Sequence, residues 1–438
     1  MKLHTKLLSN IPARRELTVS LAAVLLIFFG TFHPIFSIAA FGLCCAAMMY
    51  MRKSYFLCLL FLIMPLAGIF KLSPNSTSLF TYLELLYVIW HIYKQKFRIS
   101  IGELLALLFL AYISITALAW ATIPVTNTIK SVVNLMLIGY FAELDMEKED
   151  KQLFLCYILG ILISSFIRLA NSSMFPIADY VTDKTETFQH MMTIVRFSGL
   201  YGDPNYYSIN VIIAMCLTIL LYRRRKLNFP VTACLFTALL IFVGMTGSKS
   251  SFLMLVFPIL LLLYTCLKNR NYIALILCIL AFLAVVVLVE MGSIQIFDYV
   301  LLRLTNTGTS TESFTTGRSE LWWQYTQYLK RHPLLLIFGS GSAFFTLNGH
   351  APHNTYLDFV FQFGILGTIL YGVTVLYLVK KAKPPIKRNL LNYSVLAVVM
   401  IMYFFLSELL CIDLPFHIAL FFCVYNLQIA EPYKRHRI

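Results

Sequence analysis

The residues best suited to chemistry lie in one polar stretch, residues 291–354, the longest interruption between apolar segments in the chain. This stretch contains Arg303, Arg318, His350, His353 and Asn354. A guanidinium group offers planar, paired and permanently charged donors that fit phosphoryl oxygens. A neutral imidazole can accept a proton from a hydroxyl group. The stretch could therefore bind a phosphate ester and activate a hydroxyl nucleophile.

His353 is the strongest candidate for the base. Pro352 suits the first turn of a helix, which would place His353 at the N-terminal end of the apolar segment that follows. The positive end of the helix dipole there disfavours imidazolium. His350, three residues earlier, is the weaker candidate, and a histidine that only caps a helix or bonds a loop is the structural alternative.

Composition assigns the chain to the membrane. Hydrophobic residues make up 59% and charged residues 13% of its 438 residues, whereas a soluble domain carries roughly a quarter charged residues. The net charge of +15 does not indicate a nucleic-acid partner, because most cations form short clusters between apolar runs, where they set topology and meet anionic lipid headgroups. The ten cysteines form no C-x-x-C pair, and no metal site or cofactor is predicted.

Apolar runs long enough to cross a bilayer predict an all-α, polytopic bundle of about 12–14 transmembrane helices. The candidate spans are 18–32, 34–51, 54–70, 78–93, 101–120, 124–142, 152–171, 204–222, 229–246, 249–267, 271–290, 355–379, 390–411 and 415–430. The first two share a tip at His33-Pro34 and could instead form one bent hairpin. Residues 1–438 are thus interpreted as a single membrane domain.

The distribution of cations predicts the orientation. With the N-terminus in the cytoplasm, every second connection is cytoplasmic, and these connections hold 25 of the 35 Lys and Arg residues. The opposite orientation would contradict the positive-inside tendency. Both termini are therefore expected inside, which leaves two long outer loops, residues 172–203 and the larger 291–354. Within the larger loop, residues 318–331 predict a helix that either lies in the headgroup layer or packs on the bundle.

Five cations are expected at the outer membrane boundary: Lys130, Arg196, Lys249, Arg303 and Arg318. Each alone could be a structural ion pair or a snorkelling side chain. Together they favour an electropositive cleft for a lipid-linked phosphate or diphosphate. Lys249 lies in Thr246-Gly247-Ser248-Lys249-Ser250, which lacks the G-x-x-x-x-G-K spacing of a nucleotide-binding loop. Asp203-Pro204 is predicted to cap and begin the helix near 204–222.

Three motifs carry a family resemblance. They are Arg196-Phe197-Ser198-Gly199-Leu200-Tyr201-Gly202-Asp203-Pro204-Asn205, Thr316-Gly317-Arg318-Ser319-Glu320-Leu321-Trp322 and Pro352-His353-Asn354-Thr355-Tyr356-Leu357-Asp358. In this order, with membrane segments between them, they resemble the O-antigen polymerase and O-antigen ligase superfamily over roughly residues 190–380.

The resemblance implies a membrane glycosyltransferase of surface polysaccharide assembly, in the bacterial cytoplasmic membrane, active on its outer face. Its donor would be an oligosaccharide on undecaprenyl diphosphate, and it would need no metal or other cofactor. Arg196 and Arg318 match family arginines thought to engage the donor diphosphate, and His353 matches the histidine proposed to activate the acceptor hydroxyl. Lys249 departs from the family, which often has arginine there. The remaining predicted substrate-binding residues are Arg303, His350 and Asn354.

Three functions remain open on sequence alone. The first is a polymerase that extends lipid-linked repeat units, with a chain-length regulator and a flippase as candidate partners. The second is a ligase that transfers the glycan to lipid A-core or another anchor. The third is a lipid-linked oligosaccharide flippase or transporter, which would normally place ionisable residues at mid-membrane and show repeated halves. The ionisable residues here cluster at one face, which favours an enzyme.

Overall fold

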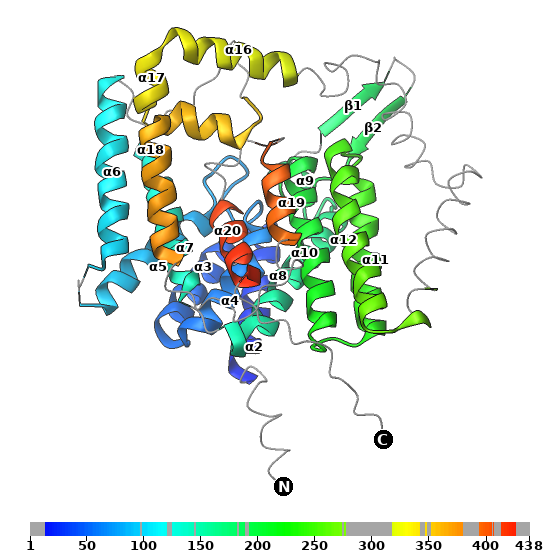
Figure 1. Cartoon of the computed structure of the whole chain (residues 1–438). Helices are drawn as coiled ribbons and strands as arrows, with labels where there is room; N and C mark the ends of the chain where they lie inside the picture. Colours follow the sequence, from blue (N-terminus) through cyan, green and yellow to red (C-terminus); the bar gives the residue numbers. More distant parts are fainter. Residues whose placement is uncertain are drawn as a thin grey trace, which may run out of the picture.

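The computed structural model describes residues 14–96, 99–120, 125–143, 146–181, 184–188, 192–273, 276, 318–341, 347, 352–379, 394–404, 406 and 413–425. Over these residues the chain forms a bundle of helices with one two-stranded hairpin at one end (Figure 1). The elements are α2 (Arg14–Phe29), α3 (Pro34–Tyr50), α4 (Lys53–Ile63), η1 (Met64–Leu66), α5 (Leu79–Lys94), α6 (Ile101–Ala119), α7 (Val125–Ala142), α8 (Met146–Leu169), α9 (Ile177–Tyr180), β1 (Lys184–Phe188), β2 (Met192–Arg196), α10 (Pro204–Arg223), α11 (Phe229–Met245), α12 (Lys249–Lys268), α16 (Arg318–Arg331), α17 (Pro333–Phe338), α18 (Thr355–Val379), α19 (Ser394–Met402) and α20 (Asp413–Tyr425).

The prediction of a polytopic helical membrane protein is confirmed. Within the described residues, five helical stretches are long and apolar enough to cross a membrane: Ile101–Ala119, Lys151–Leu169, Pro204–Arg223, Lys249–Lys268 and Thr355–Leu378. Shorter apolar helices lie at Pro34–Tyr50, Lys53–Leu66, Thr128–Ala142 and Phe229–Met245. The predicted span 271–290 falls almost wholly outside the described residues. The first two apolar runs form two separate helices, α2 and α3, because His33 caps α3 through its side chain and Pro34 begins it.

One expectation requires correction. The sequence offered no strand pattern, yet β1 and β2 pair as an antiparallel hairpin, with Lys184 opposite Arg196 and Phe188 opposite Met192. Five-residue strands carry little periodic signal, and a two-stranded hairpin depends on its surroundings for stability. A hydrogen bond attaches the end of this hairpin to α11: the Phe197 N–H donates to the Met245 carbonyl, the last of α11, at 3.1 Å.

The centre of the bundle is α10, which is buried along most of its length and packs on α8, α11, α12 and α19. A polar contact joins three helices in this apolar interior. The Asn210 side-chain oxygen accepts from the Tyr157 hydroxyl at 2.6 Å and lies 3.0 Å from Nε2 of the fully buried His417. Polar groups without partners are costly inside a membrane bundle, so this contact fixes α8, α10 and α20 relative to one another.

The two ends of the bundle differ. The hairpin, α16 and α17 lie at the upper end in Figure 1, and the connections α5–α6, α10–α11 and the end of α12 lie at the lower end. The lower connections carry basic clusters such as Arg223-Arg224-Arg225-Lys226. The sequence predicts that these clusters lie on the cytoplasmic side, and the orientation of the bundle in the membrane stays a prediction.

Close main-chain contacts at Gly339 and Gly364, which we call the glycine interlock, fix the end of α17 and so position α16, the helix before it. The run that reads as one helix, α18, is kinked at Gly364, whose φ is +63°. A Cβ at Gly364 would lie 2.3 Å from the Ile337 carbonyl oxygen, and one at Gly339 would lie 2.3 Å from the Gly364 nitrogen. The Tyr112 hydroxyl of α6 closes the contact by donating to the carbonyls of Phe338 at 2.8 Å and Phe363 at 3.0 Å. The end of α17 is thereby fixed against both α6 and α18.

This interlock predicts that Gly364→Ala destabilises the protein by roughly 2–4 kcal/mol, because an added Cβ meets both a forbidden backbone conformation and main-chain atoms. Thermal unfolding of the purified protein in detergent measures the effect. Gly372→Ala in the same helix is the matched control, since a Cβ there meets no atom within 4 Å, and its stability should stay the same or rise. Equal melting of the two variants would show that the kink does not depend on glycine.

Candidate functional site

Arg196 is fixed where the hairpin meets the end of α11. Its Nε–H donates to the Thr246 carbonyl at 2.9 Å, and its Nη2 donates to the Asn205 side-chain oxygen at 3.4 Å. The side chain is 5% exposed. These two partners, a carbonyl and an amide oxygen, orient the guanidinium. Such preorganisation is what an anion-binding group requires.

Two helices begin beside Arg196, and they are capped differently. The Asp203 carboxylate caps α10 by accepting from the Asn205 N–H at 2.8 Å, as predicted, so the positive end of α10 is compensated. Ser248 precedes α12, but its side chain makes no capping bond. Its hydroxyl instead donates to the Asn205 oxygen at 2.7 Å and lies 3.0 Å from the Ser250 hydroxyl. The positive end of α12 therefore faces the same cluster as Arg196.

Lys249 is the first residue of α12 and is half-buried. It follows Ser248 directly, and Gly247 before it has a φ of +56°, which allows the sharp turn from α11 into α12. The structure thus joins Arg196 and Lys249 at one place, although 53 positions separate them in the chain. A helix N-terminus with two neighbouring cations is a suitable place for a phosphate group.

The second group of predicted residues lies around α16. The predicted helix 318–331 is confirmed, with Arg318 as its first residue. It packs on the bundle: Tyr325 and Leu329 are buried against Phe361 of α18, and the rings of Tyr325 and Phe361 meet edge to face at 4.8 Å. Burial raises the pKa of Tyr325 to about 12, with a further contribution from the charge of Asp358. Its neutral hydroxyl oxygen accepts from the Leu347 N–H at 3.0 Å.

A hydrogen bond connects α16 to the segment that carries His353. The Trp322 indole Nε1–H donates to the Pro352 carbonyl at 2.9 Å. Arg318 lies four residues before Trp322, so the two side chains share one face of the helix. Arg318 is therefore directed to the same side as the Pro352-His353 segment.

The local structure at His353 differs from the expectation. Pro352 is not in the first turn of a helix, because α18 begins at Thr355 and Asn354 is its cap. The Asn354 side-chain oxygen accepts from the N–H groups of Tyr356 at 3.0 Å and Leu357 at 3.1 Å. The first N–H groups of a helix have no partner within the helix, and the Asn354 side chain supplies one, which proline could not do. Asn354 thus has a structural role that the prediction of substrate binding did not include.

His353 remains at the start of α18, in an unusual conformation. Its φ is +47°, in the left-handed region, and it is exposed between the buried residues Pro352 and Asn354. The segment is held from the other side by Thr355, whose N–H donates to the Tyr403 carbonyl at 2.8 Å and whose hydroxyl donates to the Leu406 carbonyl at 2.7 Å. The imidazole is thus presented outward from a fixed backbone.

The two groups lie at the same end of the bundle. Helix α19 packs on α10 and α12, which carry the Arg196 cluster, and the residues just after it hold Thr355. Figure 1 shows the hairpin and α16 together at this end. Lys130 lies in α7, which packs on α6, α18 and α20. Arg303 and His350 lie outside the described residues.

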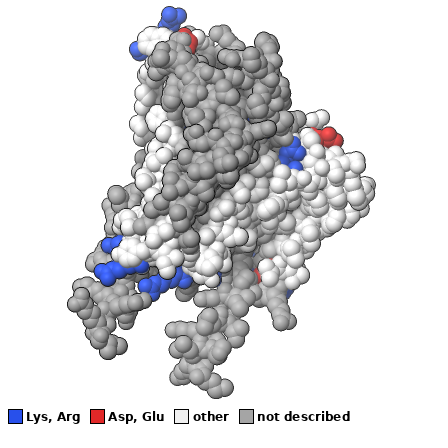
Figure 2. Space-filling view, turned by 90° about the vertical axis from the view of Figure 1, so that its right-hand side faces the viewer, with Lys and Arg blue, Asp and Glu red and all other residues white. Residues whose placement is uncertain are grey.

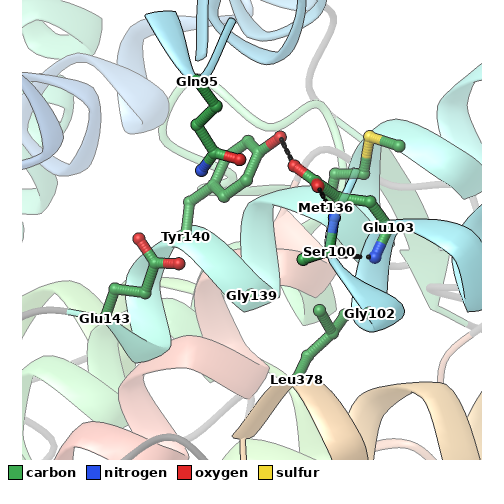
Figure 3. A pocket seen from close by; sticks show the side chains of 9 residues that line it. All are labelled: Gln95, Ser100, Gly102, Glu103, Met136, Gly139, Tyr140, Glu143 and Leu378. Atoms are coloured by element: carbon green, nitrogen blue, oxygen red, sulfur yellow. Dashed lines mark hydrogen bonds between the residues drawn. The ribbon is translucent and has the colours of Figure 1, made fainter. Parts of the chain in front are cut away.

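A second group of ionisable residues lies at the opposite end. Figure 3 shows the Tyr140 hydroxyl directed at Glu103, 3.4 Å from its carboxylate, in a cavity that Glu143 and Gln95 also line. The cavity holds about 10 Å³, room for a single water molecule. Glu103 also completes a capping box with Ser100, and Lys53 pairs with Glu143. These side chains are explained by structure and have no space for a substrate. Across the described residues, no three His, Cys, Asp or Glu side chains come together to hold a metal ion.

Sequence reasoning missed three residues that build the site: Asn205, Ser248 and Trp322. Asn205 and Ser248 fall within segments already singled out, but their contact joins α10 to α12 across 43 positions, which spacing cannot reveal. For Trp322 the available signal was its indole donor, because a buried indole N–H usually finds a partner.

Fold and site together define a polytopic membrane protein with two cationic groups at one end of a helical bundle. Residues 233–372, about a third of the chain, match the family described as O-antigen ligase. This match confirms the resemblance to the O-antigen polymerase and ligase superfamily and indicates a glycosyltransferase-like activity. It includes Lys249, Arg318, His353 and Asn354, whereas Arg196 lies outside it and joins it through Thr246. No curated protein and no solved structure matches the chain.

The capping role of Asn354 leads to a prediction. Asn354→Ala should lower stability by about 1 kcal/mol, because two main-chain N–H groups lose their acceptor, whereas Asn354→Ser should stay close to wild type. Thermal unfolding in detergent compares the two variants. If alanine and serine were equally tolerated, the side chain would not be what holds the start of α18.

Proposed function

We propose that the chain is a membrane glycosyltransferase that moves a glycan from undecaprenyl diphosphate to an acceptor hydroxyl on the outer face of the cytoplasmic membrane. The observation that carries the proposal is the bond from Trp322 to the Pro352 carbonyl. It couples the helix that begins with Arg318 to the segment that presents His353. Arg318 and the exposed His353 would then lie on one side of α16, as transfer from a diphosphate requires.

The conformation of His353 supports a functional role. In the described residues four non-glycine residues have positive φ, and His353 alone of these lies at the end with the Arg196 cluster. A left-handed backbone costs roughly 1–2 kcal/mol for an L-residue. Such strain is concentrated at functional sites, where a particular side chain must point in a particular direction.

In the proposed reaction, an acceptor sugar hydroxyl attacks the anomeric carbon of the donor glycan. His353 takes the hydroxyl proton as the new C–O bond forms, and the bond from the anomeric carbon to the diphosphate oxygen breaks. The electron pair leaves with the diphosphate. Arg318, Arg196, Lys249 and the positive end of α12 stabilise the growing negative charge. The protein mainly orients the two partners, since a diphosphate is already a competent leaving group.

The cationic cluster at Arg196 fits the diphosphate end of the donor. Arg196 and Lys249 bring two positive charges to the start of α12, where Ser248 leaves the positive helix end without a side-chain cap. The lysine provides charge without the paired donors of arginine. We assign Arg303, His350 and Asn354 to the same substrate region, with Asn354 acting through the backbone it holds.

We favour a polymerase, whose acceptor is the next lipid-linked repeat unit and whose partners include a chain-length regulator and a flippase. The ligase alternative, with lipid A-core or another anchor as acceptor, has its own support, because the matching family is described as O-antigen ligase. Both acceptors offer a sugar hydroxyl, so the same residues would serve either reaction.

Transfer by the purified protein, with a synthetic undecaprenyl diphosphate glycan as donor, tests the chemistry. His353→Ala should lower the rate by about 10²–10⁴-fold, the range of a general base. Arg318→Ala should lower it by about 10²–10³-fold, the range for one donor to a developing anion. Lys330→Ala, an exposed cation near the other end of α16, is the control and should leave the rate unchanged. Normal transfer by the His353 and Arg318 variants would refute the assignment.

Deleting the gene and separating surface polysaccharide on a gel distinguishes the two acceptors. Loss of a polymerase leaves anchors that carry a single repeat unit, because chains no longer grow. Loss of a ligase leaves long chains that are not attached to the anchor. A profile identical to wild type would contradict both versions of the proposal.

A further inference from the structure

A basic cleft opens at the end of the bundle opposite the candidate site. It has a volume of about 600 Å³ and lies where the connection from α10 to α11 meets the end of α12. Arg225, Lys226 and Arg270 line it, together with the neutral residues Asn228 and Asn271. Among the residues that the structure describes, none that lines the cleft is acidic. An anionic group fits such a lining.

Two equivalent turns hold the arginines. After α10, the Lys226 N–H donates to the Leu221 carbonyl at 2.9 Å, and after α12 the Asn271 N–H donates to the Cys266 carbonyl at 2.9 Å. In both turns the residue before the donor is left-handed, with φ of +59° at Arg225 and +53° at Arg270. Glycine is the usual residue at this position of a helix end. The fold therefore accepts strain at two neighbouring helix ends and gains a guanidinium at each.

The cleft lies about one membrane thickness from the candidate site. Helix α10 starts beside Arg196 and runs for 20 residues before the cleft, roughly 30 Å at 1.5 Å per residue, which is the thickness of the hydrocarbon layer. In Figure 2, Lys and Arg side chains gather at the lower end of the face that shows the α11–α12 side of the bundle. The cleft thus lies at the second membrane–water boundary.

The surroundings of the cleft indicate a lipid. Val231 at the start of α11, Leu267 at the end of α12 and Ile273 beyond it are 43%, 52% and 74% exposed. Each lies within three residues of a lining residue in the chain, so a ligand held here can place a charged group in the cleft and hydrocarbon beside it. The Asn271 side chain already donates to the Tyr222 hydroxyl at 2.9 Å, which fixes part of the lining.

We propose that this cleft binds the headgroup of an anionic phospholipid, with Arg225 and Arg270 contacting the phosphodiester and Lys226 adding charge. Basic pockets between transmembrane helices are suited to anionic headgroups. The site is separate from the proposed transfer reaction and holds whether or not that reaction is correct.

Thermal unfolding of the purified full chain in detergent, titrated with phosphatidylglycerol, tests the site. The double variant Arg225→Gly and Arg270→Gly removes both charges and places the preferred residue in each turn, so misfolding cannot explain a loss of binding. Its half-maximal lipid concentration should rise roughly 30-fold, since each cation near the surface contributes roughly fivefold. Lys96→Gly is the matched control, because Lys96 is also left-handed at a helix end (φ +54°) and lies outside the cleft.

Two comparison ligands complete the test. Phosphatidylcholine has the same phosphodiester without net charge and should stabilise the protein much less than phosphatidylglycerol. Inorganic phosphate at equal concentration should have little effect, because it lacks the acyl chains. The proposal fails if the double variant responds to phosphatidylglycerol as wild type does, if phosphatidylcholine acts equally well, or if free phosphate alone reproduces the stabilisation.

Discussion

The site end of this protein depends on main-chain carbonyls that helix breaks would otherwise leave without partners. In a membrane bundle such groups must be satisfied within the protein, and here donor side chains from distant elements satisfy them. Arg196 donates to Thr246 and Trp322 to Pro352, while Trp120 donates to Gly339 at 3.0 Å. Each bond ends one helix against another element. The same bonds therefore allow irregular backbone at the membrane boundary and fix the residues that it carries.

The Arg196 side chain both closes a helix end and fixes a second element of the site. Its Nε–H closes the end of α11, and its Nη2 holds Asn205 at the start of α10. Both of these partners are neutral groups, and they fix the orientation of the guanidinium. An anionic substrate at the start of α12 would meet a donor group that the fold already orients, which links the structure of this corner to the function proposed for it.

The sequence predicted what local patterns encode. Apolar runs located nearly every described helix, the pair Asp203-Pro204 predicted the start of α10, and the pattern of residues 318–331 predicted α16 with its ends. What it could not predict depends on contacts between distant segments. The kink at Gly364 lies in a continuous apolar run, and only the approach of Ile337 and Gly339 shows why glycine is needed there. The hairpin was missed because its strands are short and its position is set by α11.

At His353 two local signals competed. Proline at 352 suited the first turn of a helix, but asparagine at 354 is the stronger cap, and the helix starts after it. The predicted start of the helix was wrong by only a few residues, yet the difference changes the conformation expected for His353. His353 became an exposed, left-handed residue instead of the first turn of a helix. His353 stays the proposed base because of its residue type, but the structural argument for it is now its exposed, left-handed position and no longer a place in the first turn of a helix.

The left-handed residues divide the molecule into two chemically different ends. At the upper end of Figure 1 they are the glycines 199, 202, 247, 339, 341 and 364, which let backbone segments approach closely. At the lower end they are Lys96, Arg225 and Arg270. Glycine would be easier to accommodate at those turns as well, so the basic residues are explained by what their charges do at a membrane surface. His353 breaks the division, since it is the described non-glycine residue among the glycines of the upper end. A side chain retained where the rest of that end uses glycine agrees with the role proposed for His353.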